Sequence, residues 1–282
     1  MMLTIAYLGP EKTNTHKAAL SRFGRRNVKY VHAPTVDDVF QLVERRIAAY
    51  GVVPVENSLE GAVTHTLDRF IDFTDTPVTI QGELERPVRH YLITKRKTPL
   101  SRIKMIYSHP QALAQCNKWL NQRLPYADRR EVDTTARAAW IVLYPGNKQL
   151  AAAIGPRDLG GKRARVREIH LGHKNVTRFL ILGRGQPPRR KRNKTSILIA
   201  LKDKPGALHD ILVPFKKYRL NLTKIESRPS KRKAWEYIFL IDVEGHVADL
   251  RMTRALKTLK TRAARLQVLG SYPLGRVLLR RQ

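Results

Sequence analysis

Thr177 and Arg178 bring a hydroxyl and a guanidinium to the start of an apolar segment, residues 179–182. This segment has the composition of a buried β-strand, which would hold the two polar groups rigidly. A hydroxyl can handle a substrate oxygen, and a guanidinium binds a carboxylate through paired hydrogen bonds. The pair therefore indicates chemistry on an anionic substrate, although an exposed strand edge is the commoner origin of such a pattern. The rest of the chain decides between these two interpretations.

Polar donors also accumulate where predicted strands meet predicted helices, which we place near residues 16–23, 62–70, 111–120 and 137–143. Ligands of open α/β sheets bind at the carboxyl ends of strands, and helix N-termini favour anions. At two of these junctions the ordinary alternative is helix capping, by Thr15 and by His109. The candidate substrate-binding residues at the junctions are Thr13, Glu56, Asn57, Ser58, Ser108, Gln111, Thr134 and Thr135.

The chain has 282 residues, which is long enough for two domains with separate cores. Its charge is unusual, because 54 Lys and Arg oppose 23 Asp and Glu and leave a formal net charge of +31. Such a field speeds the capture of anions and binds nucleic acid non-specifically at low salt. A small anionic substrate needs few cations, so the excess leaves solubility, an acidic partner and host adaptation as open explanations.

The single cysteine, Cys116, has no partner for an internal disulfide, which fits a reducing compartment. We expect it to be buried on an apolar helix face. Residues 1–8 are apolar but carry no basic leader, and Gly9-Pro10 ends the run early. We therefore expect neither a signal peptide nor a membrane span, and a cytoplasmic location. The chain shows no Gly-rich phosphate loop and no metal-binding cluster of cysteines, so a nucleotide or metal is not indicated.

Composition changes abruptly after Gly183. Residues 185–194 combine two prolines with a basic run and are predicted to form a solvated linker. Residues 195–272 then follow the order strand, helix, strand, strand, helix, strand, which is the ferredoxin-like βαββαβ arrangement. Residues 273–282 form a basic tail.

Several long motifs resemble those of prephenate dehydratases with a fused ACT regulatory domain. The dehydratase-like motifs are residues 53–61 (VPVENSLEG), 108–116 (SHPQALAQC) and 175–179 (NVTRF), and the ACT-like motifs are residues 221–229 (NLTKIESRP) and 235–237 (WEY). The resemblance spans nearly the whole chain. It implies an α/β fold, with a two-lobed catalytic domain like periplasmic binding proteins at residues 1–184 and a ferredoxin-like ACT domain at residues 195–272.

The resemblance implies conversion of prephenate to phenylpyruvate with loss of water and carbon dioxide, and it implies no cofactor. Thr177 would assist departure of the hydroxyl and Arg178 would hold a carboxylate. The other candidate residues would line a cleft between the lobes. An alcohol is a weak acid, so polarisation of the leaving group or a proton relay by Thr177 is favoured over simple acid catalysis.

The ACT resemblance implies feedback inhibition by phenylalanine, bound where subunits meet in a homodimer or homotetramer. The residues implied to carry phenylalanine are Gly206, Ala207, Leu208, Glu226, Ser227 and Arg228. The resemblance implies no membrane partner, and nucleic acid would bind only non-specifically through the basic surface.

The first loop departs from the family pattern. Lys12, Asn14 and Lys17 replace the usual Gly, Phe and Glu, and Arg137 stands where an acidic residue is common. Lys12 would occupy a turn that glycine tolerates with a positive φ. Two alternative functions remain: an arogenate dehydratase, and a non-catalytic derivative that senses amino acids or binds nucleic acid.

Overall fold

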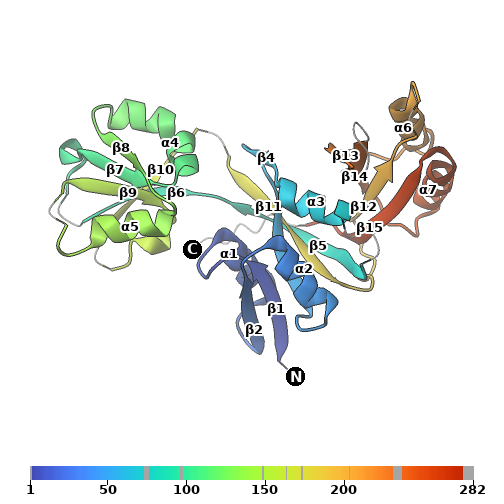
Figure 1. The fold of residues 1–282 in the computed structure, drawn as a ribbon, viewed down its shortest axis with the longest axis horizontal. Coiled ribbons are helices and arrows are strands. Elements are labelled where there is room, and N and C mark those ends of the chain that lie inside the picture. The colour runs from blue at the N-terminus through green and yellow to red at the C-terminus, as the bar shows by residue number, and fades with distance from the viewer. Residues whose placement is uncertain are drawn as a thin grey trace. The chain divides into compact units, whose positions relative to one another are not determined.

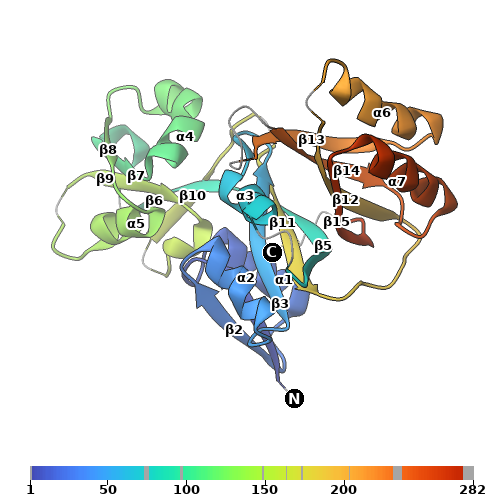
Figure 2. The ribbon, with the colours of Figure 1, turned by 45° about the vertical axis from the view of Figure 1, so that its right-hand side comes forward.

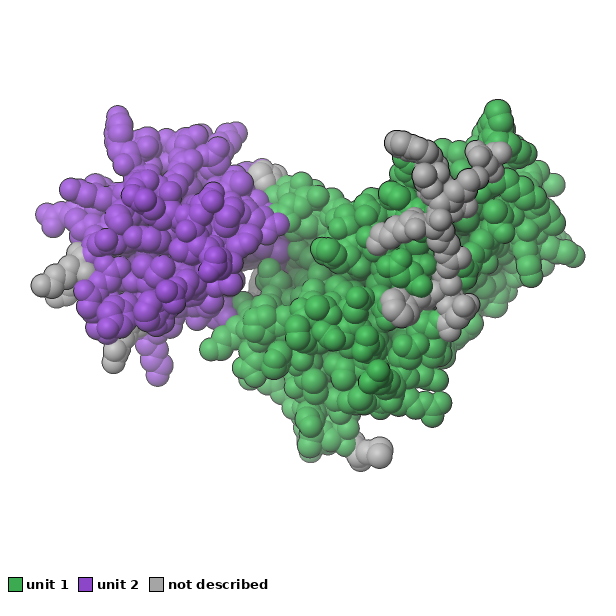
Figure 3. All heavy atoms as spheres, in the orientation of Figure 1, with its two compact units in different colours: residues 1–86, 176–282 green, residues 87–175 purple. Residues whose placement is uncertain are grey.

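The computed structural model describes residues 2–72, 76–95, 98–147, 149–162, 164–172, 174–202, 204–230 and 237–275. The chain divides into two compact units, coloured separately in Figure 3. Unit 1 comprises Met1–Arg86 and Val176–Gln282, and unit 2 comprises Pro87–Asn175. Unit 2 is therefore one continuous segment inserted into unit 1, and the chain enters it once and leaves it once.

Unit 1 contains a mixed sheet that positions the first group of candidate residues (Figure 1). Its strand order is β2 (Val28–Ala33), β1 (Leu3–Leu8), β3 (Tyr50–Asn57), β11 (Val176–Arg184) and β5 (Val78–Pro87), with the short β4 (Gly61–Ala62) paired to β3. The first three strands are parallel, and β11 returns antiparallel to β3. The helices of this part are α1 (Asn14–Phe23), α2 (Val36–Glu44) and α3 (Thr64–Asp72).

Strand β11 is buried on both faces because its side chains alternate between two cores. Phe179 and Ile181 pack with Ala18 and Ala19 of α1. On the other face, Leu180 and Leu182 join a cluster that contains residues of α2, α3 and the ACT-like sheet. The apolar run at residues 179–182 is therefore a strand shared by two cores.

The ACT-like part of unit 1 has the predicted βαββαβ order. Its sheet order is β13 (Leu222–Pro229), β14 (Tyr237–Glu244), β12 (Asn193–Ala200) and β15 (Arg265–Pro273). Figure 2 shows α6 (Ala207–Lys217) and α7 (Leu250–Arg262) on one face of this sheet. On the opposite face, Leu240 and Leu269 share a core with Phe70 of α3 and Ile80 of β5. The ACT-like sheet therefore packs between its own helices and the other sheet and helices of unit 1.

Unit 2 is a second α/β layer structure. Its strand order is β10 (Ala164–Ile169), β6 (His90–Lys95), β9 (Ala151–Gly155), β7 (Met105–Ser108) and β8 (Asp128–Glu131). Two clusters fill its core, one around α4 (Pro110–Arg123) and one around α5 (Thr135–Leu143). Short 3₁₀ turns lie at Leu100–Arg102 and Arg157–Leu159. Cys116 is buried in the α4 cluster, and this burial raises the pKa of its thiol to about 12, as expected for a packing residue.

Four strands were not predicted: charged residues interrupt the apolar alternation of β2, β8 and β10, and β4 has only two residues. Strand β12 begins at Asn193, inside the segment predicted as a linker. Lys194 is buried there because it pairs with Glu83. Residues 235 and 236 of the ACT-like motif and residues 276–282 of the predicted tail lie outside the described residues. Within the described residues, no helix has the length and apolarity needed to cross a membrane.

Gly270 of β15 lies against β5, and this contact predicts a test of the packing between the two sheets. A Cβ atom at Gly270 would collide with the carbonyl oxygen of Ile80 and lie 2.8 Å from the Ile80 Cβ. We expect Gly270→Ala to lower the free energy of unfolding by about 2–3 kcal/mol in urea denaturation, because backbone cannot move aside cheaply. The matched control is Gly82→Ala in β5, whose Cβ would meet Ile181 at an ordinary 3.5 Å. Equal stability losses in the two variants would contradict this packing.

Candidate active site

Thr177 and Asn57 form a buried hydrogen-bonded pair across two strands. They are register partners in the β11–β3 ladder, and each is 9% exposed. The Asn57 Nδ2 donates to Thr177 Oγ1 over 2.9 Å. The Asn57 Oδ1 accepts from the backbone N–H groups of Leu59 at 2.9 Å and Glu60 at 3.3 Å. These bonds fix the amide so that its nitrogen faces Thr177, and the threonine hydroxyl keeps its proton for another acceptor.

The hydroxyls of Ser58 and Thr13 lie at the same end of this sheet and bind backbone groups. Ser58 Oγ accepts from Val176 N at 2.9 Å, and Ser58 N donates to the Val176 carbonyl at 2.9 Å. Thr13 Oγ1 accepts from His16 N at 3.2 Å and donates to the Pro10 carbonyl at 3.0 Å. Thr13 is thus the N-cap of α1, and the expectation of Thr15 as the cap is wrong, because Thr15 lies within the first turn.

The first loop contains the positive φ expected at Lys12, which has φ 67°. Lys12 N donates to His16 Nδ1 at 2.9 Å, and the His16 ring stacks on Tyr7 with ring centroids 4.6 Å apart. Burial lowers the pKa of His16, against an opposing effect of Glu11. A neutral ring suits the acceptor role of Nδ1. In this chain the imidazole of His16 therefore holds a loop that glycine would otherwise favour.

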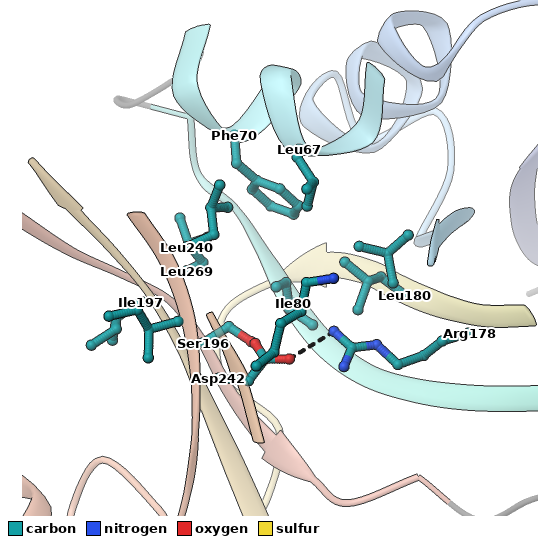
Figure 4. A pocket seen from close by; sticks show the side chains of 13 residues that line it. Leu67, Phe70, Ile80, Arg178, Leu180, Ser196, Ile197, Leu240, Asp242 and Leu269 are labelled. Atoms are coloured by element: carbon teal, nitrogen blue, oxygen red, sulfur yellow. Dashed lines mark hydrogen bonds and ion pairs between the residues drawn. The ribbon is translucent and has the colours of Figure 1, made fainter. Parts of the chain in front are cut away.

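Arg178 faces the opposite side of β11 from Thr177, because successive strand residues alternate. Its guanidinium contacts three carboxylates: Asp242 at 2.7 Å, Glu83 at 3.7 Å and Glu56 at 3.7 Å. Figure 4 shows the Arg178 and Asp242 side chains pointing toward each other. Asp242 belongs to β14 of the ACT-like sheet. The residue predicted to hold a substrate carboxylate thus binds protein carboxylates in this structure.

The surroundings of Arg178 stabilise its charge. Burial alone disfavours the guanidinium, but Asp242, Tyr272 and Glu83 together raise the pKa of Arg178 above its usual value. Tyr272 is fully buried, and burial followed by the charges of Asp242 and Glu83 raises its pKa well above the usual range. Asp242 Oδ1 also accepts from Ser196 Oγ at 2.5 Å. Tyr272 is therefore a neutral phenol beside the Arg178–Asp242 ion pair.

In unit 2, the candidate residues gather at one edge of the sheet. Strands β7, β8 and β9 are parallel, so their carboxyl ends lie together. Ser108 ends β7, and its buried hydroxyl donates to the Ile154 carbonyl of β9 at 2.7 Å. Thr134 is the N-cap of α5, and its Oγ1 accepts from Arg137 N at 3.0 Å. Thr135 lies close to the end of β9, because a Cβ atom added to Gly155 there would be 3.2 Å from the Thr135 Cβ.

The first turn of α4 reaches the same edge, with Pro110 at its start and Gln111 exposed. His109 Nδ1 accepts from Gln111 N at 3.3 Å, so the expected capping role of His109 is confirmed. Two helix N-termini thus open at this edge beside exposed hydroxyl and amide groups. That combination suits an anion.

The candidate effector residues occupy two neighbouring elements of the ACT-like part. Gly206 adopts φ 77° immediately before α6, Ala207 is buried, and Leu208 is 39% exposed. Glu226, Ser227 and Arg228 lie on β13, which is an edge strand. Arg228 donates from Nε at 3.1 Å and from Nη2 at 3.0 Å to Asp68 Oδ1 of α3.

Sequence reasoning missed Glu83 in β5 and Asp242 in β14. A carboxylate within an apolar run is expected to have a partner, so both residues carried a signal. Lys194 was assigned to the linker, and Lys224 was passed over within a longer motif. Among the described residues, no group of three or more histidine, cysteine or acidic side chains is placed to hold a metal ion.

The fold and the site define an α/β enzyme with an appended ferredoxin-like regulatory domain. The sequence profile described as prephenate dehydratase matches residues 5–187, and that of the ACT domain matches residues 195–261. The chain belongs to the prephenate dehydratase family, which confirms the resemblance seen in the sequence. The expected fold class is confirmed as well.

Relatives extend over nearly the whole chain. A bifunctional chorismate mutase/prephenate dehydratase of Aquifex aeolicus (strain VF5) is 43% identical over 96% of this chain and 74% of its own length. A prephenate dehydratase of Methanocaldococcus jannaschii is 34% identical over 97% of this chain and 99% of its own. An arogenate dehydratase/prephenate dehydratase 2 of Arabidopsis thaliana is 33% identical over 98% of this chain and 74% of its own.

A solved structure of prephenate dehydratase in complex with L-Phe, from Arthrobacter aurescens, has a TM-score of 0.83 and 34% identity. The alignment covers 96% of this chain and 90% of that one. The shared fold therefore includes both the dehydratase and the ACT parts.

The burial of Arg178 predicts a stability effect. We expect Arg178→Met to lower the free energy of unfolding by about 3–5 kcal/mol, because Asp242 and Glu83 would be left as buried charges without their common partner. The measurement is denaturation by urea with circular dichroism. A solvent-facing arginine kept for substrate would lose less than about 0.5 kcal/mol on substitution, and that result would rule out this account of the pairing.

Proposed function

We propose that this protein converts prephenate to phenylpyruvate, releasing water and carbon dioxide. The observation that carries the proposal is the Asn57–Thr177 hydrogen bond, set within a chain of this family. In the reaction the bond from the ring to its carboxylate breaks and its electrons enter the ring. The 4-hydroxyl leaves, takes up a proton and becomes water. The ring becomes aromatic, so the enzyme needs chiefly to orient the substrate and assist this departure.

Thr177 is the residue proposed to assist the leaving hydroxyl. Asn57 donates to its oxygen, so the threonine proton is directed to another acceptor. A donor held in place before the reaction stabilises negative charge that develops on the departing oxygen. Donation of a hydrogen bond, or relay of a proton, fits an alcohol better than release of its own proton as a strong acid.

The edge of unit 2 is proposed to bind an anionic group of the substrate. Gln111, Thr134 and Thr135 lie at helix N-termini, where backbone N–H groups and the helix dipole favour negative charge. Ser108 is proposed to support this edge, because its hydroxyl ties β7 to β9. Ser58 and Thr13 have the corresponding task in unit 1, where they hold the strand start and the first loop. Glu56 is proposed to help hold Asn57 and Ser58 in position for the substrate.

Phenylalanine is the proposed effector of the ACT domain. The left-handed Gly206 lets the chain turn closely into α6, and Leu208 and Ile225 are exposed apolar side chains at 39% and 46%. An aromatic amino acid would cover such groups while its charged ends met helix N-H groups and polar residues of β13. Exposure of the edge strand β13 favours a homodimer or homotetramer that completes the site. A cytoplasmic location is part of the same proposal.

Replacing the threonine hydroxyl tests the proposed chemistry. We expect Thr177→Val, which keeps the shape of the side chain, to lower kcat at least about 100-fold, since the donor to the leaving oxygen is lost. Phenylpyruvate formation from prephenate is followed by absorbance. Thr15→Val serves as the matched control within the same lobe. Absence of turnover by the parent chain, or full activity of Thr177→Val, would refute the proposal.

An arogenate dehydratase is the nearest alternative, and the Arabidopsis relative bears both names. The two substrates differ by an ammonium group in place of a keto group. Rates with each substrate separate the two activities. A non-catalytic derivative, which the charge of +31 left open in the sequence, would show salt-sensitive retention on nucleic acid and no turnover of either substrate.

The effector proposal predicts loss of phenylalanine binding in Leu208→Asp. A carboxylate at this exposed position would repel the carboxylate of the amino acid and remove its apolar contact. We expect affinity to fall at least about 30-fold in isothermal titration calorimetry. Leu250→Asp, an exposed leucine at the start of α7, is the matched control and should bind as the parent does. Equal binding by both variants would move the effector elsewhere.

A further inference from the structure

A cluster of six charged side chains joins the catalytic part of unit 1, which contains β1 to β5 and β11, to the ACT domain, and only Glu56 among them has a place in the function proposed above. We name it the interdomain charge cluster. It contains Glu56, Glu83 and Arg178 from the catalytic part, and Lys194, Lys224 and Asp242 from the ACT domain. Three acids balance three cations here, whereas over the whole chain 54 Lys and Arg face only 23 acids. The scarce acids are concentrated at this contact.

The ion pairs of the cluster are tight between domains and loose within the catalytic part. Arg178 lies 2.7 Å from Asp242, while its contacts to Glu56 and Glu83 are both 3.7 Å. Lys194 holds Glu83 at 2.9 Å and Lys224 holds Glu56 at 3.1 Å. Each of these three shorter pairs crosses from one domain to the other. The cluster therefore ties the ACT sheet to the catalytic part through its three shortest ion pairs.

A small cavity lies beside Arg178. Its Nε is buried and donates no hydrogen bond among the described residues. A cavity of about 20 Å³, lined by Arg178, Lys224 and Asp242 among others, adjoins it (Figure 4). This volume suits a water molecule and is far too small for the substrate. The guanidinium therefore lies beside a space that can hold one water molecule.

The cluster includes the sequence neighbours of Asn57 and Thr177. Arg178 follows Thr177 in β11, and Glu56 precedes Asn57 in β3. Each strand thus carries one residue of the Asn57–Thr177 hydrogen bond and, beside it, one residue held by the ACT domain. A shift of either charged residue moves the backbone that sets the geometry of that hydrogen bond.

The cluster also adjoins the strand proposed to bind the effector. Lys224 and Asp242 are register partners in the β13–β14 ladder. Glu226, a candidate effector residue, lies two positions along β13, and its carboxylate is 3.9 Å from Lys224. An effector bound at Glu226 would therefore lie close to Lys224 on the same strand and to Asp242 on the adjacent strand.

We propose that Asp242 is a positioning residue for the dehydratase reaction. Through Arg178 it holds the strand start that carries Thr177, and Lys224 acts in parallel through Glu56 on Asn57. Inhibition by phenylalanine is a change in these pairs, which misaligns the hydroxyl of Thr177. This inference rests on the proposed function and gives Arg178 a role distinct from binding substrate.

Kinetics of single and double variants test the proposal in the full-length chain. The variants are Asp242→Asn, Arg178→Gln and the double substitution. We expect each single change to lower kcat about tenfold with KM within about threefold, and the double variant to be no more than about twofold slower than the slower single one. Lys224→Gln replaces Asp242→Asn in the test if that variant does not fold, and it should also lower kcat. Asp37→Asn, which removes the carboxylate 3.2 Å from buried Arg69 in the same unit, should leave kcat within about twofold.

Other kinetic outcomes overturn the proposal. A large rise in KM for Arg178→Gln with unchanged kinetics for Asp242→Asn would make Arg178 a substrate ligand. Independent, multiplying effects of the two changes would remove the coupling. An equal loss of kcat in Asp37→Asn would mean that the cluster contributes only to stability.

Amide hydrogen exchange provides a readout that does not depend on turnover. Phenylalanine should change exchange at residues 176–180 in the parent chain and leave it unchanged in Asp242→Asn, which still binds phenylalanine by calorimetry. The same exchange response in both proteins would overturn the coupling. An inactive parent chain that shows the expected exchange pattern would refute the proposed function alone.

Discussion

The antiparallel pairing of β11 with β3 is the constraint on which the rest of the site depends. Its register sets Thr177 opposite Asn57 and Arg178 opposite Glu56. Because side chains alternate along a strand, the first pair faces the side of α1 and the second faces the ACT domain. A slip by one residue would exchange these faces and bury the hydroxyl where the guanidinium now lies. The proposed chemistry and the proposed regulation thus occupy opposite sides of one ladder.

The charges behind this ladder explain why the ACT domain and the first lobe form one unit. Burying an ion is unfavourable unless a partner and further hydrogen bonds replace its water. Arg178, Lys194, Glu83 and Asp242 meet this condition only when the ACT sheet lies against the lobe. The apolar contact of that sheet with α3 and β5 provides the main attraction, and the ion pairs determine its register.

Much of this organisation follows from the sequence because apolar periodicity and helix-start signals are local. The βαββαβ order, the strand at residues 179–182 and the caps at α4 and α5 are all of this kind. Strands rich in charge, such as β8 (Asp128–Glu131), lack that signal and gain their place from neighbouring strands. The partner of Arg178 lies 64 positions away in β14, a distance that no local pattern reports.

The assignment of Arg178 shows where local reasoning reached its limit. Adjacent residues of a strand face opposite ways, so Thr177 and Arg178 were poor candidates for binding two groups of one substrate. Asp242 carried a second signal, as a carboxylate inside an apolar run. Combining the two signals would have indicated a buried ion pair, although its location between domains required the folded chain. Lys194 was assigned to the linker because it follows a run of basic residues, so its burial was not predicted.

The most direct test of this account measures both products of the reaction together. The full-length chain is given prephenate, and carbon dioxide release and phenylpyruvate are followed in the presence and absence of phenylalanine. We predict equal amounts of the two products and a clear fall in both rates when phenylalanine is added. No release of carbon dioxide, or release that phenylalanine leaves unchanged, would contradict a dehydratase governed by its ACT domain.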